Sequence, residues 1–244
     1  MPVVESIGDS AFLNCSSLVS VHAPLVTSIG ESAFHSCSSL VAVFAPQVTS
    51  VADYSFWSCS SLTSVSMPLA TSVGDYVFFA CARLANVSMP LVVTVESAAF
   101  LSCSNLTRID MPVVTRVGSY AFRGCSSLTL VSMPLVTLVK EEAFHSCFSL
   151  TSMDMPLATR VDANAFEGCH TLTGVTMTAV TSLGASAFSD CSSLVSVDTS
   201  LVTAVGSYAF ERCLSLGNIN ASRLTHVSAG AFHQCFSFTN LYMP

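Results

Sequence analysis

The sequence predicts a solenoid of eleven 22-residue units, with a parallel sheet on one face and short turns or 3-10 segments on the other. Cysteine recurs at a constant interval of 22 residues, phenylalanine stands three positions before each cysteine, and leucine stands three positions after it in ten units of eleven, with Phe238 as the exception. A fixed period of this length is the signature of a repeat array, in which each unit is one turn stacked on the next. The array spans residues 3–244 as a single domain, and Met1-Pro2 continue the same phase. The column cysteines are Cys15, Cys37, Cys59, Cys81, Cys103, Cys125, Cys147, Cys169, Cys191, Cys213 and Cys235.

Each unit resolves into three segments, illustrated by the one that begins at Leu62. Leu62, Val65 and Met67 alternate with Ser64 and Ser66, which predicts a short strand with its apolar side chains inward and its serines outward. A proline then ends the strand because it has no N–H for the next ladder bond.

The other two segments follow the proline. A second extended stretch is typified by residues 26–30, and the Ala-Phe-x-x-Cys sequence after it predicts one helical or 3-10 turn. That turn would bury the alanine, phenylalanine and cysteine, as in Ala33, Phe34 and Cys37.

The composition excludes several classes of protein. Of the 244 residues, 51% are hydrophobic and only 9% are charged, against roughly 25% charged in an average soluble domain. Eight Lys and Arg against fifteen Asp and Glu give a net charge of −7. We therefore expect no nucleic-acid partner, which would need clustered bases. We also expect no membrane insertion, because no apolar stretch approaches the ~18 residues of a spanning helix.

The repeat pattern resembles a known family. Ala-Phe-x-x-Cys-x-x-Leu-x-x-Val-x-Met-Pro is similar to the BspA-like leucine-rich repeats of surface proteins in some bacteria and protists, and the resemblance covers residues 3–244. The period of 22 is one shorter than the 23 common in that family. The resemblance implies a non-enzymatic protein for adhesion or protein binding at the cell surface or outside the cell. That location rests on the resemblance alone, since no signal-peptide pattern stands in these residues.

The sequence gives no catalytic site and no cofactor. The serines belong to repeat columns, and a nucleophilic triad would need three different columns to meet at one point. The eleven cysteines are expected to be buried, reduced core side chains. Parallel side chains one unit apart do not converge to the Cβ distance that a disulfide prefers, and eleven is an odd number.

One column of acidic residues precedes the phenylalanine turn in four consecutive units, at Asp9, Glu31, Asp53 and Asp75. Short acidic side chains at the start of a turn accept N–H groups, which makes capping the main expectation. Weak Ca²⁺ binding by neighbouring carboxylates is the alternative.

Apolar side chains at outward positions predict an interaction surface. Units 3 to 5 place Tyr54, Trp57, Tyr76, Phe79 and Leu101 on the turn side of the solenoid. A contiguous aromatic patch of this kind usually marks a contact surface. The alternative is that the rings fold down over the turn and serve packing alone.

The two ends of the array predict a second kind of contact. Each end exposes a cross-section of the core and an unpaired strand edge. The side chains concerned are Phe12, Leu18 and Val21 at one end and Phe232, Phe238 and Leu241 at the other. Because Met1-Pro2 repeat the phase of Met243-Pro244, copies could stack head to tail, or the chain could be an excerpt from a longer array.

Three functions follow from these observations. We favour a scaffold that binds a protein, or a glycan, through the polar strand face or the aromatic patch. Self-assembly into filaments or a surface layer is the second function. The third is an ice- or mineral-binding surface, because threonines form a regular column at Thr27, Thr49, Thr71, Thr115 and Thr137.

Overall fold

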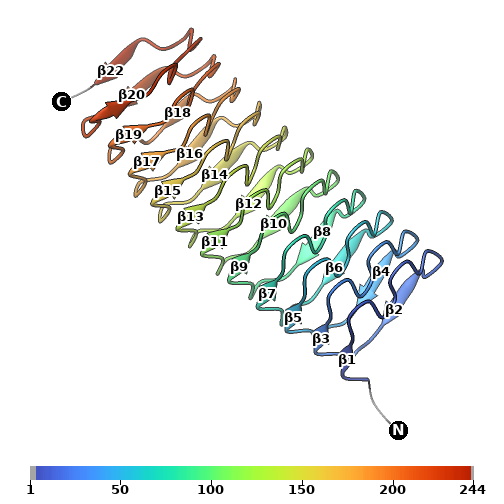
Figure 1. The fold of residues 1–244 in the computed structure, drawn as a ribbon. Helices are drawn as coiled ribbons and strands as arrows, with labels where there is room; N and C mark the ends of the chain where they lie inside the picture. Colours follow the sequence, from blue (N-terminus) through green and yellow to red (C-terminus); the bar gives the residue numbers. More distant parts are fainter. Residues whose placement is uncertain (1–3, 243–244) are drawn as a thin grey trace.

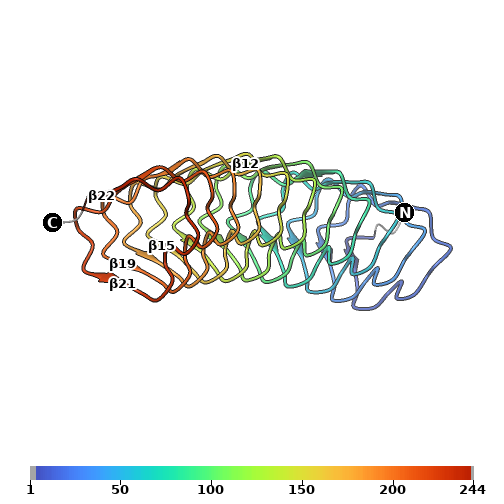
Figure 2. The same ribbon diagram turned by 90° about the horizontal axis from the view of Figure 1, so that it is seen from above.

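The computed structural model describes residues 4–242 and shows a parallel β-solenoid with two strands in each turn (Figure 1). Seen from above, the turns stack one behind another into an elongated coil, with β22 at one end and the N-terminal turns at the other (Figure 2). The predicted solenoid is confirmed, and no helix occurs in the part of the chain that the structure describes.

The odd-numbered strands form one continuous sheet of eleven strands in chain order. They are β1 (Ser6–Ile7), β3 (Ser28–Ile29), β5 (Ser50–Val51), β7 (Ser72–Val73), β9 (Thr94–Val95), β11 (Arg116–Val117), β13 (Leu138–Val139), β15 (Arg160–Val161), β17 (Ser182–Leu183), β19 (Ala204–Val205) and β21 (His226–Val227). Every pairing is parallel and offset by one unit, so that Ser28 pairs with Ser50 and Ile29 with Val51. The predicted second extended segment is therefore a strand.

The even-numbered strands carry the Leu-x-x-Val-x-Met segment and lie side by side along the other edge of each coil (Figure 1). They are β2 (Ser20–His22), β4 (Ala42–Phe44), β6 (Ser64–Ser66), β8 (Asn86–Ser88), β10 (Arg108–Asp110), β12 (Leu130–Ser132), β14 (Ser152–Asp154), β16 (Gly174–Thr176), β18 (Ser196–Val197), β20 (Asn218–Asn220) and β22 (Asn240–Tyr242). Their hydrogen bonding divides them into sheets β2–β8, β10–β18 and β20–β22, again with parallel pairing and the offset of one unit.

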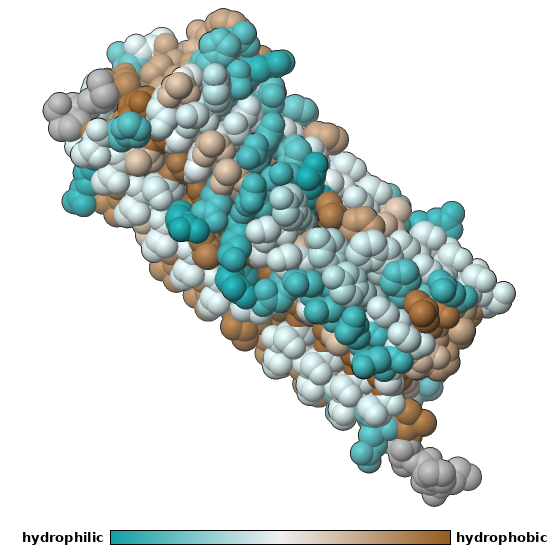
Figure 3. Space-filling view, viewed as in Figure 1, coloured by the Kyte–Doolittle hydropathy of each residue, from teal (hydrophilic) through white to brown (hydrophobic). Residues whose placement is uncertain are grey.

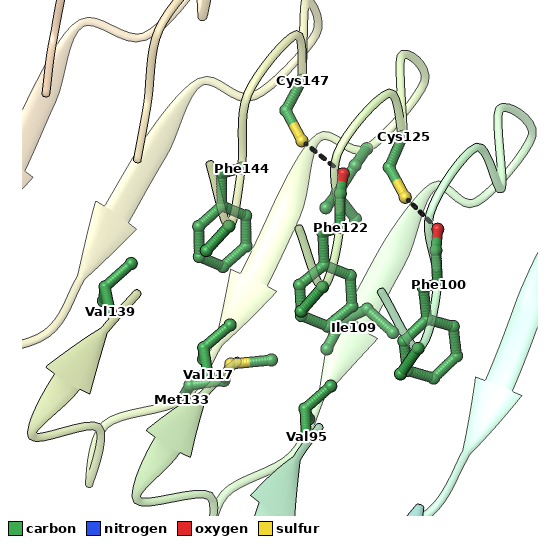
Figure 4. Close-up of a cluster of buried hydrophobic side chains, with 14 of the residues drawn as sticks. Val95, Phe100, Ile109, Val117, Phe122, Cys125, Met133, Val139, Phe144 and Cys147 are labelled. Atoms are coloured by element: carbon green, nitrogen blue, oxygen red, sulfur yellow. Dashed lines mark hydrogen bonds between the residues drawn. The ribbon is translucent and has the colours of Figure 1, made fainter. Parts of the chain in front are cut away.

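The core is a set of columns in which like residues stack on like. Leu62, Val65 and Met67 are almost completely buried while Ser64 and Ser66 are exposed, as the alternation predicts. The phenylalanines form a ladder of nearly parallel rings, with Phe100 and Phe122 at a centroid distance of 5.1 Å (Figure 4). Offset stacking of this kind adds about 0.5–1.5 kcal/mol per pair to the burial of the rings.

The phenylalanine segment is a chain of tight turns, and the 3-10 part of the expectation is not found in the described residues. In the second unit Ser32 and Ser36 have positive φ angles of 53° and 59°. Ala33 N–H donates to Gly30 O in the manner of a 3-10 turn, but Phe34 N–H donates to Ser55 O of the next unit at 2.7 Å. In a continuous 3-10 helix, both of these N–H groups would donate within their own unit. The residues with positive φ angles therefore turn every second peptide toward the neighbouring unit.

The column thiols take part in this stacking as donors. Cys125 Sγ donates to Phe100 O at 3.2 Å and Cys147 Sγ donates to Phe122 O at 3.2 Å, each reaching back to the preceding unit (Figure 4). All eleven cysteines are free; nine are buried, Cys235 is half-buried and Cys15 is exposed. Burial raises the pKa of the Cys59 thiol and of the Cys169 thiol to about 12. The thiols are therefore neutral hydrogen-bond donors in the core.

Two phenylalanines in one turn give a test of the ladder. Phe144 is completely buried in the ring stack, whereas Phe148, four residues later, is 44% exposed. We predict that Phe144→Ala lowers the free energy of unfolding by about 3–5 kcal/mol, because it removes a core ring and leaves a cavity. The matched change Phe148→Ala should lower it by less than about 1 kcal/mol. Urea denaturation followed by circular dichroism measures both, and equal losses would contradict the assignment of Phe144 to the core.

The thiols give a second test. A thiol with a pKa raised by burial stays protonated below that value, so the nine buried cysteines should resist an alkylating reagent even at pH 9, where ordinary thiols ionise. Mass spectrometry of the folded protein should show rapid labelling of Cys15 and slower labelling of Cys235. After denaturation without reductant, all eleven should react. A single reactive thiol under those conditions would instead indicate five disulfides and would refute the assignment.

Candidate functional site

Four aromatic side chains of units 3 and 4 form one cluster on the turn side of the solenoid. Tyr54 and Tyr76 occupy the left-handed position of their turns, with φ angles of 57° and 54°. Trp57 and Phe79 follow the buried column phenylalanines Phe56 and Phe78. Positions 22 residues apart lie over one another in neighbouring units. The two tyrosines therefore stack on each other, and Trp57 lies against Phe79.

The rings contact one another closely. Trp57 and Phe79 have centroids 4.1 Å apart, Tyr54 and Tyr76 are 5.5 Å apart and nearly parallel, and Trp57 lies 5.4 Å from Tyr76. All four are half-buried, so each ring keeps part of its surface in solvent. Leu101 continues the column of Trp57 and Phe79 in the next unit and is half-buried too. Together, these side chains form the aromatic patch: Tyr54, Trp57, Tyr76, Phe79 and Leu101.

Sequence reasoning did not include the residue that extends the patch toward the N-terminus. His35 stands one unit before Trp57 in the same column, and its ring stacks on the indole at 5.8 Å with an interplanar angle of 6°. The 22-residue offset was the available signal, since it places the two rings over each other. His35 therefore belongs to the same surface as the patch.

On the C-terminal side of the patch, charged groups lie close to the same columns. Arg123 lies 5.8 Å above the ring of Tyr120 and pairs with Glu142 at 2.6 Å. His145 lies 3.2 Å from the same carboxylate, and burial lowers its pKa in spite of the nearby carboxylates of Glu167 and Glu142. In the view of Figure 3, hydrophilic residues form a band along the long axis of the molecule, beside paler and more hydrophobic areas.

The three aspartates of the acidic column serve as caps between units. Asp9 Oδ1 accepts the N–H of Glu31, Asp53 Oδ1 accepts the N–H of Asp75, and Asp75 Oδ1 accepts the N–H of Ser97. Each of these three bonds is 2.8 Å long and joins one unit to the next. Within residues 4–242, no three or more His, Cys, Asp or Glu side chains are arranged to hold a metal ion. In the described part of the chain, no cluster of ligands therefore supports the alternative of Ca²⁺ binding.

The threonine column is also engaged within the solenoid. The hydroxyls of Thr27, Thr49, Thr71, Thr115 and Thr137 each donate to a carbonyl 22 residues earlier, at 3.0–3.3 Å. The hydroxyl proton of each threonine is therefore used between units, and only its acceptor capacity faces the solvent.

The end residues named from the sequence lie at the two end cross-sections of the described coil. Phe12 is 37% exposed and borders an apolar hollow of about 370 Å³ that also contains Val21. Leu18, Phe232, Phe238 and Leu241 are half-buried against the core. The ring of Phe238 stacks on Phe232 at 5.0 Å. Met1-Pro2 and Met243-Pro244 lie outside the described residues, and head-to-tail stacking stays a prediction.

The comparisons with known proteins agree with this architecture. The chain matches the family described as "BspA type Leucine rich repeat region (6 copies)" over residues 2–95, 49–173 and 137–244. The protein therefore belongs to the BspA-type leucine-rich repeat family, whose repeats build scaffolds. Among the described residues there is no helix long and apolar enough to cross a lipid bilayer.

Two solved structures are informative neighbours. A leucine rich cell surface protein from Faecalibacterium prausnitzii A2-165 is 26% identical, with a TM-score of 0.59, and the match covers 98% of this chain and 76% of that one. The pneumococcal vaccine antigen PcpA is 15% identical, with a TM-score of 0.57 and coverages of 89% and 60%, so this similarity shows the fold alone. No sequence among curated proteins matches significantly.

Proposed function

We propose that this protein is a non-enzymatic scaffold at the cell surface that binds a protein partner, with the aromatic patch as its contact surface. The observation that carries the proposal is the cluster of Tyr54, Trp57, Tyr76 and Phe79, whose rings lie 4.1–6.1 Å apart. Tryptophan and tyrosine dominate the energetics of protein interfaces because they bring a large apolar area with few rotatable bonds. A glycan is the alternative partner, since sugars also pack on aromatic rings.

The patch differs from the other exposed aromatic side chains of the described coil. Phe44 stacks only on His22, and Phe148 stacks only on His170, so each makes a pair. The patch has four mutually supporting rings, and His35 adds a fifth. Rings that hold each other in place lose little freedom when a partner binds, which favours affinity.

The surface location is supported by the family and by the neighbour from Faecalibacterium prausnitzii, which is described as a leucine rich cell surface protein. The repeated columns also support a scaffold rather than an enzyme. Each column presents the same type of side chain at intervals of one unit, which suits an extended contact better than a converging set of catalytic groups.

Replacement of the tryptophan tests the proposal. We predict that Trp57→Ala weakens binding by about 2 kcal/mol, as for an anchor of an interface, and leaves the circular dichroism spectrum of the solenoid unchanged. The readout is the binding of labelled protein to a panel of immobilised extracellular matrix and cell-surface proteins. Phe148→Ala is the matched control, because it removes an exposed ring elsewhere on the solenoid.

Two results would count against the patch. One is that the Trp57→Ala and Phe148→Ala variants both bind as tightly as the unchanged protein to every immobilised protein that binds it. The other is that Trp57→Ala lowers the melting temperature and leaves binding untouched, which would mean that the rings serve packing alone.

A further inference from the structure

The charges of the chain are distributed unevenly along the solenoid. Residues 1–107 contain six acidic side chains and one basic side chain, Arg83, whereas residues 108–244 contain nine acidic and seven basic side chains. The aromatic patch lies in the first of these segments. The acidic residues of that segment are Glu5, Asp9, Glu31, Asp53, Asp75 and Glu96. The patch is thus set in the part of the coil where negative charge is least compensated.

The carboxylates beside the patch lack a cationic partner within the described part of the chain. The ion pairs found between residues 4 and 242 include Glu96 with Arg116 at 2.7 Å, but none of Asp9, Glu31, Asp53 and Asp75. The backbone N–H groups that Asp53 and Asp75 accept engage one carboxylate oxygen each and do not neutralise the charge. These groups therefore remain available to a cation from outside.

A shallow hollow brings two of these carboxylates, Glu31 and Asp53, together with Glu96, whose charge is already paired with Arg116. It has a volume of about 280 Å³ and is lined by Glu31, Asp53 and Glu96 together with small residues of β5 and β7 and the positions that follow them. Ser50, Ser72 and Gly74 leave room above the sheet because their side chains are short or absent. The hollow adjoins the patch through the chain itself, since Asp53 directly precedes Tyr54.

We propose that this surface docks a lysine- or arginine-rich segment of a protein partner, an inference that rests on the proposed function and specifies its partner. A basic head group enters the hollow beside Glu31 and Asp53, where the two carboxylates attract it. The aliphatic stem lies over the solvent-exposed part of the aromatic patch, whose rings are half-buried. Long basic side chains pack their stems on apolar surface.

A second copy of this chain is a poorer occupant. Each copy carries a net charge of −7. Five of its eight cations, at Arg108, Arg116, Arg123, Arg160 and Arg212, already form ion pairs in the described residues. Charge complementarity therefore favours a basic partner over self-association through this face.

The chain has a single tryptophan, and it lies in the patch, so its fluorescence reports on this surface directly. The probe is octalysine, titrated into the 244-residue protein at low salt. We expect saturable binding with a change in Trp57 emission, and little change with octaglutamate or fully acetylated octalysine. Affinity should fall about tenfold or more when the ionic strength rises from 0.05 M to 0.5 M, because exposed charges are screened.

Neutral variants separate this site from attraction by net charge. The double variant Glu31→Gln/Asp53→Asn keeps amide oxygens as hydrogen-bond acceptors and should bind octalysine about fivefold or more weakly. The control is Asp154→Asn/Asp198→Asn, which removes the same charge from exposed positions of the strand face and should change affinity less than about twofold. Equal losses in both variants, or no saturable emission change at all, would overturn the basic-partner inference.

The same binding experiments test the proposed function independently of the basic partner. If Trp57→Ala abolishes binding to an immobilised surface protein while octalysine neither binds nor competes, the patch is an interface and its partner is not basic. If octalysine competes with that surface protein and the Glu31→Gln/Asp53→Asn variant loses both ligands, the inference and the proposed function are supported together. If the Trp57→Ala variant retains both interactions, the aromatic patch is not a contact surface.

Discussion

The in-register stacking of identical positions, 22 residues apart, is the constraint on which the rest of this structure depends. It sets the pairing of every strand, as in Ser28 with Ser50, and it places Phe100 5.1 Å from Phe122. One turn alone buries too little apolar surface to offset the conformational entropy of its 22 residues, so each unit is stable only between neighbours. Side chains also bond between neighbouring units, as the thiol of Cys125 does to Phe100 O and the hydroxyl of Thr49 does to Thr27 O.

The same constraint explains both the unusual backbone and the candidate site. Between residues 4 and 242, nineteen non-glycine residues have positive φ angles, at a conformational cost of about 1–2 kcal/mol each. The bonds that alternate peptides such as Phe34 N–H make to the next unit offset that cost. Because tyrosines occupy this left-handed position in two adjacent units, the offset stacks them, and it stacks Trp57 beside Phe79. The patch thus differs from the equivalent positions of other units in its side chains, while the backbone is the same. A repeat scaffold can acquire a specific surface in this way.

Much of this architecture could be predicted from the sequence, because a strict period converts spacing along the chain into neighbours in space. The strand that contains Val65 follows from the alternation of apolar and polar residues, and the column of thiols and the grouping of Trp57 with Phe79 follow from the interval of 22. The turn conformation could not be predicted, since Ser32 is not a residue type that marks a positive φ angle. The hollow beside Glu31 was also missed, because it depends on how far short side chains in adjacent units leave the sheet uncovered.

A pair of deletions tests the central claim most directly. Removal of one whole unit, residues 150–171, joins Ser149 to Leu172 and keeps every column in phase. We predict that this protein folds, with one cooperative urea transition and an m-value lower by about a tenth, in proportion to the surface removed. Removal of half a unit, residues 150–160, should interrupt every column at one point and give two separate transitions or an unfolded chain. A half-unit deletion that unfolds in one transition with the stability of the whole-unit deletion would contradict the account.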